Sequence, residues 1–268
     1  METNTKRRSP LKWAGGKFKL IDRLTDRLPK GKRLVEPFVG SAVLFLNLDY
    51  EEYLLCDINP DLINLYNFIK ADTEQFIKDA KEYFIPENNE RVVFLQLRDE
   101  FNDTTDSYKK ALLFIYLNRH CFNGLCRYNK KGRFNVSFGT YTKPYFPEEE
   151  IRYFGKRSEK ATFKCQSFAE TFAELTEGDV VYNDPPYVPA SATANFTSYN
   201  TEGFTDVDQT NLALLAHGAK VPIVISNHDN DITRDLYDGM EIESFPVSRT
   251  ISCVGDNRKP VRELLAKK

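Results

Sequence analysis

The sequence lacks the features that mark several large classes of protein. It has no apolar run long enough to cross a bilayer, and its polar first residues lead into no signal-peptide core. It has no C-x-x-C pair, and its cysteines are odd in number, at positions 56, 121, 126, 165 and 253. We therefore expect no membrane association, and reduced cytoplasmic thiols in preference to a disulfide framework.

A zinc site is also poorly supported. His120, Cys121 and Cys126 lie close together in the sequence, but no second pair of ligands accompanies them. A structural zinc site usually draws four ligands from two such pairs. We therefore expect no metal.

Acidic residues are absent from two segments, although the whole chain has a net charge of only −2. None lies between Lys6 and Lys19 or between Asp106 and Glu148. Both segments are basic, and the longer one also carries Phe122, Tyr128, Phe134, Phe138 and Tyr141 among Lys109, Lys110, Arg119, Arg127, Lys130, Lys131, Arg133 and Lys143. Such segments are typical of a surface that binds a polyanion, and a solvated basic face is the alternative.

The most informative stretch is the run from Val180 to Tyr187, V-V-Y-N-D-P-P-Y. Its apolar start predicts a buried parallel strand, with Asp184 at the carboxyl end, where ligands of open α/β sheets bind. The prolines fix φ and offer no N–H, so the turn presents acceptors, the Asp184 carboxylate and the Pro185 carbonyl, beside the flat face of Tyr187. This combination suits a planar group that carries an amine. A strand followed by a turn without a ligand is the alternative.

The segment from Leu11 to Lys17, L-K-W-A-G-G-K, contains the only tryptophan of the chain. Glycine lets the backbone approach a ligand closely, and the indole offers a stacking face. A P-loop is excluded, because Phe18 stands where Ser or Thr would bind Mg²⁺ and no strand is expected before it.

Residues 33–38 predict a first strand, followed by a small-residue turn and an apolar helical stretch to about residue 48. A second strand is expected at 53–59, and it includes Asp57. A carboxylate at this distance from the turn binds ribose hydroxyls in nucleotide-binding folds. The alternative is that Asp57 caps a helix at 60–70.

The alternation of strands and helices stops between residues 72 and 152, where helices are expected at 91–101 and 108–119. It resumes with strands at 163–168, 180–184, 221–227, 241–247 and 261–265, and with helices at 171–175 and 206–219. Residues 191–203 are rich in Ser, Thr and Asn and predict a mobile loop over the site. The pattern indicates an α/β, Rossmann-like fold with an insertion suited to recognition.

Four motifs occur in the order known from one family: K-W-A-G-G-K at 12–17, E-P-F-V-G at 36–40, the block 118–135, and D-P-P-Y at 184–187. Over nearly its whole length the chain resembles the Dam-type DNA adenine-N6 methyltransferases, which modify GATC. The resemblance implies a mixed seven-stranded sheet that binds S-adenosyl-L-methionine (SAM) and no metal. Residues 1–71 and 153–268 would form the catalytic domain, and residues 72–152 an inserted, mainly helical, DNA-recognition domain.

The resemblance also assigns roles to individual residues. It implies a SAM pocket lined by Trp13, Lys17, Phe38, Asp57 and Asp184. It implies that Asp184, Pro185 and Tyr187 engage the target adenine as the catalytic group. DNA contacts are implied for Lys12, Arg119, Asn123, Leu125, Arg127 and Tyr141, and we expect Phe122 to fill the gap left by a flipped base.

Two positions depart from the family pattern. Ala42 stands where the F-x-G-x-G turn usually has its second glycine, so SAM binding should survive in weakened form. Ser137 replaces the proline of F-N-V-P-F-G, which predicts looser discrimination at one base pair if that proline touches a base.

Other activities are compatible with parts of the pattern. A methyltransferase acting on RNA or on protein glutamine could share the sheet and the P-P-Y turn, and a nicotinamide-dependent oxidoreductase could share the first strands. A catalytically silent DNA-binding protein is the non-enzyme alternative. The prediction that explains all four motifs is a monomeric enzyme acting on double-stranded DNA in the cytoplasm of a bacterium or of a phage-infected host cell.

Overall fold

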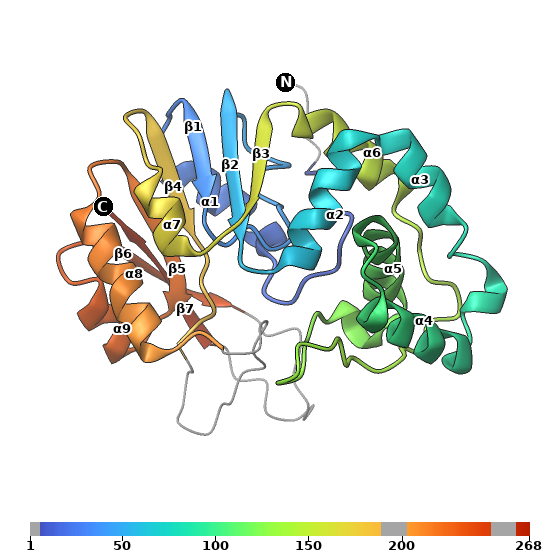
Figure 1. Cartoon of the computed structure of the whole chain (residues 1–268). Coiled ribbons are helices and arrows are strands. Elements are labelled where there is room, and N and C mark those ends of the chain that lie inside the picture. Colours follow the sequence, from blue (N-terminus) through green and yellow to red (C-terminus); the bar gives the residue numbers. More distant parts are fainter. Residues whose placement is uncertain (1–5, 189–202, 248–260) are drawn as a thin grey trace.

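The computed structural model describes residues 6–188, 203–247 and 261–268. Its centre is a seven-stranded sheet in the order β3-β2-β1-β4-β5-β7-β6 (Figure 1). The strands β3, β2, β1, β4 and β5 pair in parallel, and β7 runs antiparallel to both of its neighbours, β5 and β6. This arrangement confirms the predicted α/β class and the mixed sheet.

The strands agree closely with those predicted. They are β1 (Arg33–Glu36), β2 (Glu52–Asp57), β3 (Ala161–Cys165), β4 (Asp179–Asn183), β5 (Ile223–His228), β6 (Glu241–Val247) and β7 (Val261–Lys267). Every residue of β4 and β5 is buried, as expected for central strands covered on both faces.

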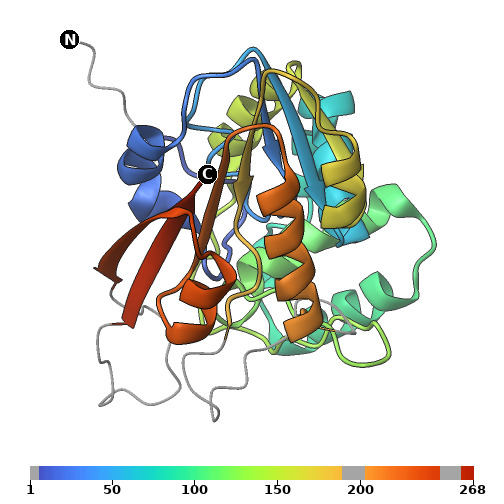
Figure 2. The ribbon, with the colours of Figure 1, turned by 90° about the vertical axis from the view of Figure 1, so that its left-hand side faces the viewer.

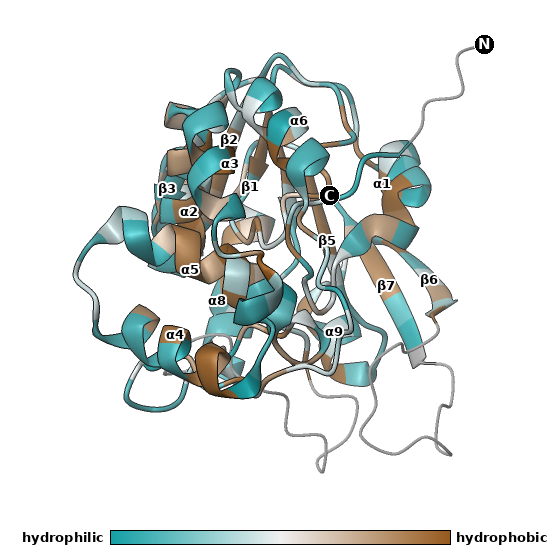
Figure 3. Cartoon of the chain, turned by 90° about the vertical axis from the view of Figure 1, so that its right-hand side faces the viewer, coloured by the Kyte–Doolittle hydropathy of each residue, from teal (hydrophilic) through white to brown (hydrophobic). Residues whose placement is uncertain are grey.

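Helices cover both faces of the sheet. They are α1 (Ile21–Arg27), α2 (Pro60–Ala71), α3 (Thr73–Lys81), α4 (Arg91–Asp103), α5 (Ser107–His120), α6 (Glu148–Ser158), α7 (Phe168–Ala173), α8 (Asp206–Gly218) and α9 (Asp231–Leu236), with short 3₁₀ helices η1 (Lys17–Leu20), η2 (Pro86–Asn88) and η3 (Phe122–Gly124). Figure 1 shows α7 and α8 in front of the sheet, and in Figure 2 they lie to its right. Figure 3 shows α2 to α5 from the other side, with hydrophobic colour in the strands behind them.

The predicted helix between the first turn and residue 48 is wrong. Residues 39–48 form consecutive turns, with Ala42 N donating to Val39 O at 2.8 Å and Leu48 N to Leu44 O at 2.8 Å. Gly40 and Ala42 have φ of +44° and +57°, and these left-handed residues interrupt a right-handed helix at its start. Ala42 therefore occupies a conformation that suits the glycine of the usual motif.

The expected recognition segment packs directly on the catalytic segment. A continuous cluster of buried residues runs from Leu34 and Leu55 in the sheet to Phe94 in α4 and Leu113 in α5. Helix α6 spans the expected boundary at residue 152, and α3 and α6 were not predicted. The functional division into residues 1–71 with 153–268 and residues 72–152 therefore stays a proposal.

Two further expectations concern the chain as a whole. Residues 191–202 of the predicted loop lie outside the described residues. In the part of the chain that the structure describes, no helix is long and apolar enough to cross a membrane.

Candidate active site

The carboxyl ends of β1, β2 and β4 meet at one edge of the sheet, and Asp184 follows β4 there, as predicted. Lys17 Nζ lies 2.8 Å from Asp184 Oδ1 and donates to Gly15 O at 2.9 Å. The same ammonium lies 4.7 Å from the centre of the Tyr187 ring. The K-W-A-G-G-K and D-P-P-Y motifs, far apart in the sequence, therefore form one site.

Two opposing effects act on the Asp184 carboxyl group. Burial raises its pKa, because removal from water disfavours the charged form, and the neighbouring Lys17 ammonium lowers it. Burial is the larger effect, so the pKa of Asp184 is raised on balance, and the ion pair with Lys17 limits this rise. An ionised carboxylate accepts hydrogen bonds and cannot donate one.

A second carboxyl group lies near Asp184. Glu36 at the end of β1 is buried, and burial raises its pKa to about 8, with Asp184 adding a smaller contribution in the same direction. Glu36 is therefore mainly neutral at pH 7. A largely neutral Glu36 limits its repulsion with the Asp184 carboxyl group.

Tyr187 is fixed from the opposite side. Its hydroxyl donates to Glu263 Oε2 at 3.3 Å, and its ring meets the ring of His228 edge to face, with centroids 4.9 Å apart. These contacts from β7 and β5 hold the ring beside Asp184, where the sequence predicted a stacking face.

Asp57 lies at the end of β2 and binds two backbone N–H groups. Its Oδ2 accepts from Gly40 N at 3.1 Å, and its Oδ1 accepts from Asn59 N at 3.0 Å. Burial raises its pKa to about 6, and these hydrogen bonds oppose the rise. The alternative interpretation, in which Asp57 caps the helix at 60–70, is wrong, because the Asn59 side chain caps α2 through Asp61 N and Leu62 N.

Gly40 brings the first two motifs together. A Cβ at this position would lie 2.8 Å from Trp13 Nε1, so the indole packs against bare backbone. The carbonyl of Gly40 accepts from Tyr66 OH at 2.6 Å, while its N–H is bound by Asp57. A side chain here would displace Trp13, which explains the glycine of E-P-F-V-G.

Phe38 lies in an aromatic cluster that the sequence analysis did not foresee. Its ring stacks on Phe168 with centroids 5.7 Å apart and meets Phe204 edge to face at 5.6 Å. Phe168 and Phe204 follow β3 and precede α8, so the cluster stands beside the ends of the parallel strands. All three rings are only half-buried and offer flat apolar surface at this edge.

The end of α5 holds the K-W-A-G-G-K segment in place. Asn118 Oδ1 accepts from Lys12 N at 2.9 Å, and Asn118 Nδ2 donates to Lys12 O at 2.8 Å and to Gly124 O at 3.2 Å. Gly124 has a φ of +63°, and a Cβ there would lie 2.2 Å from Lys12 Cβ. Asn118 begins the block 118–135 that carries the resemblance, but neither its residue type nor the resemblance predicted this role.

Arg119 does not lie on the surface, contrary to what a DNA contact requires. It is 7% exposed, and its Nε donates to Pro10 O at 2.9 Å. Because the guanidinium is used inside the protein, we correct the prediction and leave Arg119 out of the proposed interface.

Most of the other predicted DNA contacts lie on or near the turn that follows α5. Phe122 is 52% exposed on η3, and Asn123 beside it is exposed with a φ of +54°. Lys12 Nζ lies 3.8 Å from the centre of the Tyr141 ring, and Leu125 is half-buried. These residues surround the turn that joins α5 to the segment 125–141.

Arg127 lies in a short hairpin, which the bridge between Tyr128 and Phe134 closes. Its Nε donates to Asn135 Oδ1 at 2.8 Å, and its Nη2 donates to Asn135 O at 3.2 Å. Tyr128 OH donates to Asp61 Oδ2 at 2.6 Å and so anchors the hairpin to α2. The half-buried Arg127 is therefore held in a defined orientation, while Lys130 and Lys131 at the tip are exposed.

A hollow of about 400 Å³ lies at the opposite edge of the sheet, between the starts of β1, β2 and β3. Arg33 and Lys164 on its wall are paired with Asp179 and Glu174, and Lys70 binds Ala161 O. None of the motif residues lines this hollow, so we place the active site at the carboxyl edge.

Metal ligands do not gather at the site. Within residues 6–188, 203–247 and 261–268, no three His, Cys, Asp or Glu side chains form a group that could hold a metal ion. Cys121 Sγ donates to Leu125 O at 3.3 Å, and His120 Nδ1 donates to Tyr116 O at 2.9 Å.

The known proteins to which this chain is similar agree in their description. Residues 13–251 match the family model described as D12 class N6 adenine-specific DNA methyltransferase. The chain is 53% identical over 265 residues to a DNA adenine methylase of Serratia marcescens, with 97% of this chain and 98% of that protein covered. It is 51% identical to the DNA adenine methylase of Vibrio cholerae (97% and 96% covered) and 50% identical to that of Escherichia coli K12 (97% and 95% covered).

Proposed function

Because the chain belongs to the family of D12 class N6 adenine-specific DNA methyltransferases, we propose that it transfers a methyl group from SAM to adenine N6 within GATC in double-stranded DNA. The observation that carries this proposal is the joining of Lys17, Asp184 and Tyr187 at the carboxyl edge of the sheet, with an ion pair of 2.8 Å between the first two. The residues of the family motifs thus lie together and supply an ammonium group, a carboxylate and an aromatic face, which are groups that the reaction needs.

The residues at this edge fit SAM. Asp57 at the end of β2 suits ribose hydroxyl groups, and the half-buried rings of Phe38, Phe168 and Phe204 suit the flat purine. Bound SAM supplies an electrophilic methyl group on a sulfonium. Gly40, whose N–H binds Asp57, and Trp13, whose indole packs against Gly40, would complete the wall of this site.

Asp184 and the Pro185 carbonyl would bind the two N–H groups of the adenine amine. The lone pair of N6 is delocalised into the ring, so acceptors that favour a more pyramidal nitrogen make it a better nucleophile. Positive charge develops on N6 during transfer, and both a fixed carboxylate and the π face of Tyr187 stabilise that charge. The S–CH₃ bond would break as the N6–CH₃ bond forms, and the methylated N6, then cationic and strongly acidic, would release its proton to water. Asp184 would therefore act by position and charge, and it need not be a strong base.

The target base must leave the duplex to reach Asp184. Unstacking a base costs a few kcal/mol, and stacking on Tyr187 would offset part of this cost. Phe122, which is 52% exposed at the start of η3, would fill the gap in the duplex. Its exposure, next to the exposed Asn123 in η3, supports this assignment.

Transfer of the labelled methyl group of SAM tests the proposed activity. We expect label in duplex DNA that contains GATC, with the product identified as N6-methyladenine. Duplex RNA and protein serve as competing acceptors in the same mixture. Label in RNA or protein, with none in DNA, would contradict the proposal.

Sequence reading should depend on Arg127. A guanidinium can bind guanine O6 and N7 together, which contributes about 1–3 kcal/mol of discrimination. Arg127→Ala should therefore relax the preference at one G·C pair of GATC while changing overall affinity modestly. The measurement is the methylation rate on GATC and on its single-base variants at two salt concentrations.

Lys130→Ala is the matched control, because Lys130 is exposed at the tip of the same hairpin. A phosphate contact there should weaken all sequences alike and reduce the salt slope by about one. If Arg127→Ala lowers the methylation rate equally on GATC and on all of its single-base variants, then Arg127 is a phosphate contact, like Lys130.

A further inference from the structure

Buried side chains hold the D-P-P-Y turn from beneath. Gln209 Nε2 donates to Pro186 O at 2.6 Å, and Asn227 Oδ1 accepts from Val188 N at 3.1 Å. His228 Nδ1, which must carry a proton to bind a carbonyl, donates to Val188 O at 2.6 Å. Backbone groups at 186 and 188, on both sides of Tyr187, are therefore fixed by residues of α8 and β5.

Gln209 and Asn227 also bind each other. Asn227 Nδ2 donates to Gln209 Oε1 at 3.2 Å and to Tyr237 OH at 3.1 Å. Gln209 is 4% exposed and Asn227 is 0% exposed. A buried amide without partners destabilises a fold by about 1–3 kcal/mol, and here both amides satisfy their groups through the turn and through each other. The pair therefore has a defined orientation.

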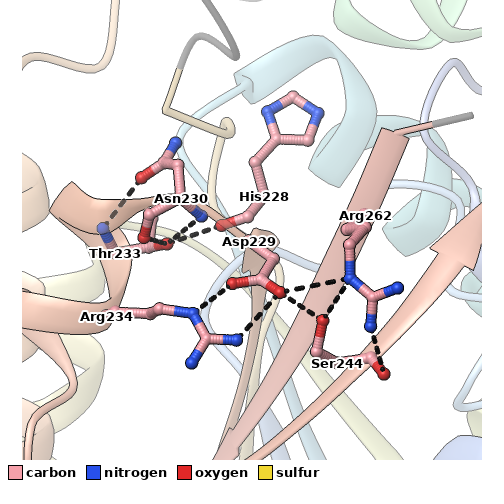
Figure 4. A network of polar contacts seen from close by, with 7 residues as sticks. All are labelled: His228, Asp229, Asn230, Thr233, Arg234, Ser244 and Arg262. Carbon is pink, nitrogen blue, oxygen red and sulfur yellow. Dashed lines mark hydrogen bonds and ion pairs between the residues drawn. The ribbon is translucent and has the colours of Figure 1, made fainter. Parts of the chain in front are cut away.

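A network of polar contacts surrounds the end of β5, as Figure 4 shows. Asp229 Oδ1 accepts from Arg234 Nε at 2.6 Å, and Asp229 also binds Ser244. Arg262 Nε lies 3.6 Å from Asp229 Oδ2. Thr233 Oγ1 donates to His228 O at 2.6 Å. These contacts tie the end of β5 to α9, β6 and β7.

The turn itself has few free torsions. Pro185 and Pro186 fix their own φ, β4 fixes the chain up to Asn183, and the amides fix it again at Pro186 and Val188. These restraints on both sides limit the directions that the Pro185 carbonyl and the Asp184 backbone can take, and the ion pair with Lys17 holds the Asp184 side chain. We propose that Gln209 and Asn227 are positioning residues for methyl transfer, which orient the acceptors for the adenine amine without touching it. This inference rests on the proposed function of the turn.

Misplacing the acceptors should slow the chemical step more than it weakens binding. A shift of about 1 Å at a reacting group can lower a rate by about 10²-fold. Gln209→Leu keeps the approximate size of the side chain and removes both hydrogen bonds. We expect its single-turnover rate at saturating SAM and DNA to fall at least about tenfold, with both dissociation constants within about threefold of wild type.

Gln209→Glu adds a readout that a packing role would not change. The protonated carboxyl group can donate to Pro186 O and accept from Asn227, as the amide does, whereas the ionised group cannot donate. Burial raises the pKa of such a carboxyl group. The rate of Gln209→Glu relative to wild type should therefore recover as pH falls. Lys17, Asp184, His228 and Glu263, the charged and titratable groups around the turn, are the same in both proteins, so the ratio at each pH removes the pH dependence that the two share.

Asn211→Leu and Asn211→Asp are the matched controls, because Asn211 is exposed on the same helix. We expect both to keep the wild-type rate at every pH. Slow, pH-recoverable transfer by the Gln209 variants, with SAM and DNA affinities retained, supports the inference.

Two outcomes would overturn it. The first is a single-turnover rate of Gln209→Leu within about twofold of wild type, well short of the loss expected for misplaced acceptors. The second is a loss of rate in Gln209→Leu that is matched by a loss of SAM affinity, together with a rate of Gln209→Glu that does not recover at lower pH. If the wild-type protein transfers no methyl group to DNA, the proposed function itself is wrong. The wild-type measurement shows this separately from the test of Gln209.

Discussion

Asp184→Ala should nearly abolish methyl transfer while leaving the protein folded. The substitution removes an acceptor for the adenine amine at the moment when positive charge develops on N6. Loss of one such group typically lowers the rate by about 10²–10³-fold. The measurement is the single-turnover rate of methyl transfer on a GATC duplex, with circular dichroism as the test of folding.

Two variants make this result interpretable. Asp184→Ala leaves the buried Lys17 without its ion pair, so a loss of stability could accompany the loss of rate. Asp184→Asn keeps the size of the side chain and one acceptor, and should lose less rate than Asp184→Ala. Asp238→Ala, at an exposed position, should behave as wild type. Turnover near the wild-type rate in Asp184→Ala would remove the D-P-P-Y turn from the mechanism.

Asp57→Ala should produce the second large effect, a loss of SAM affinity. A hydrogen bond to a charged group contributes about 1.5–3 kcal/mol, which corresponds to roughly a 10- to 150-fold rise in the dissociation constant. DNA affinity measured without SAM should change little. Equilibrium dialysis with labelled SAM gives the constant directly.

The titration of Asp57 adds a pH dependence. Burial raises its pKa to about 6, and only the ionised form can accept hydrogen bonds from both ribose hydroxyls. SAM affinity should therefore fall as pH drops below about 6 in wild type, and this dependence should be absent in Asp57→Ala. Because the pKa of Asp57 is higher in the folded state than in the unfolded state, Asp57 also makes stability depend on pH. Its contribution to the stability of the folded state is fully present below the unfolded pKa, near 3.8, and is lost as pH rises through about 6.

Asn59→Ala separates cofactor binding from helix capping. Asn59 caps α2, and removing a cap costs about 1 kcal/mol of stability. We expect Asn59→Ala to lower the melting temperature with little change in SAM affinity. Unchanged SAM affinity in Asp57→Ala would contradict the proposed ribose contact.

The sequence predicted the strands well because their apolar runs are local signals. The same holds for Asp184 and Asp57 at strand ends, since a carboxylate after an apolar run can be recognised without knowledge of distant residues. The predicted helix to residue 48 is wrong because Gly40 and Ala42 adopt positive φ. An alanine in the sequence does not indicate such a conformation.

Contacts between distant residues could not be predicted. The ion pair of Lys17 with Asp184 depends on the fold, which brings η1 to the end of β4. Likewise, the sequence shows Arg119 as one basic residue among many, and only the packing of α5 against Pro10 reveals that it is buried. Gln209 and Asn227 belong to none of the four motifs, so the sequence alone does not indicate their role.

Mapping N6-methyladenine on duplex DNA of mixed sequence, after incubation with the protein and SAM, tests the central claim most directly. The proposed function predicts N6-methyladenine at the adenine of GATC in wild type, and the acceptor role of Asp184 predicts that Asp184→Ala forms it about 10²–10³-fold more slowly. Duplex DNA that gains no N6-methyladenine, or gains it at adenines without regard to GATC, would contradict the proposed activity or its sequence specificity, respectively.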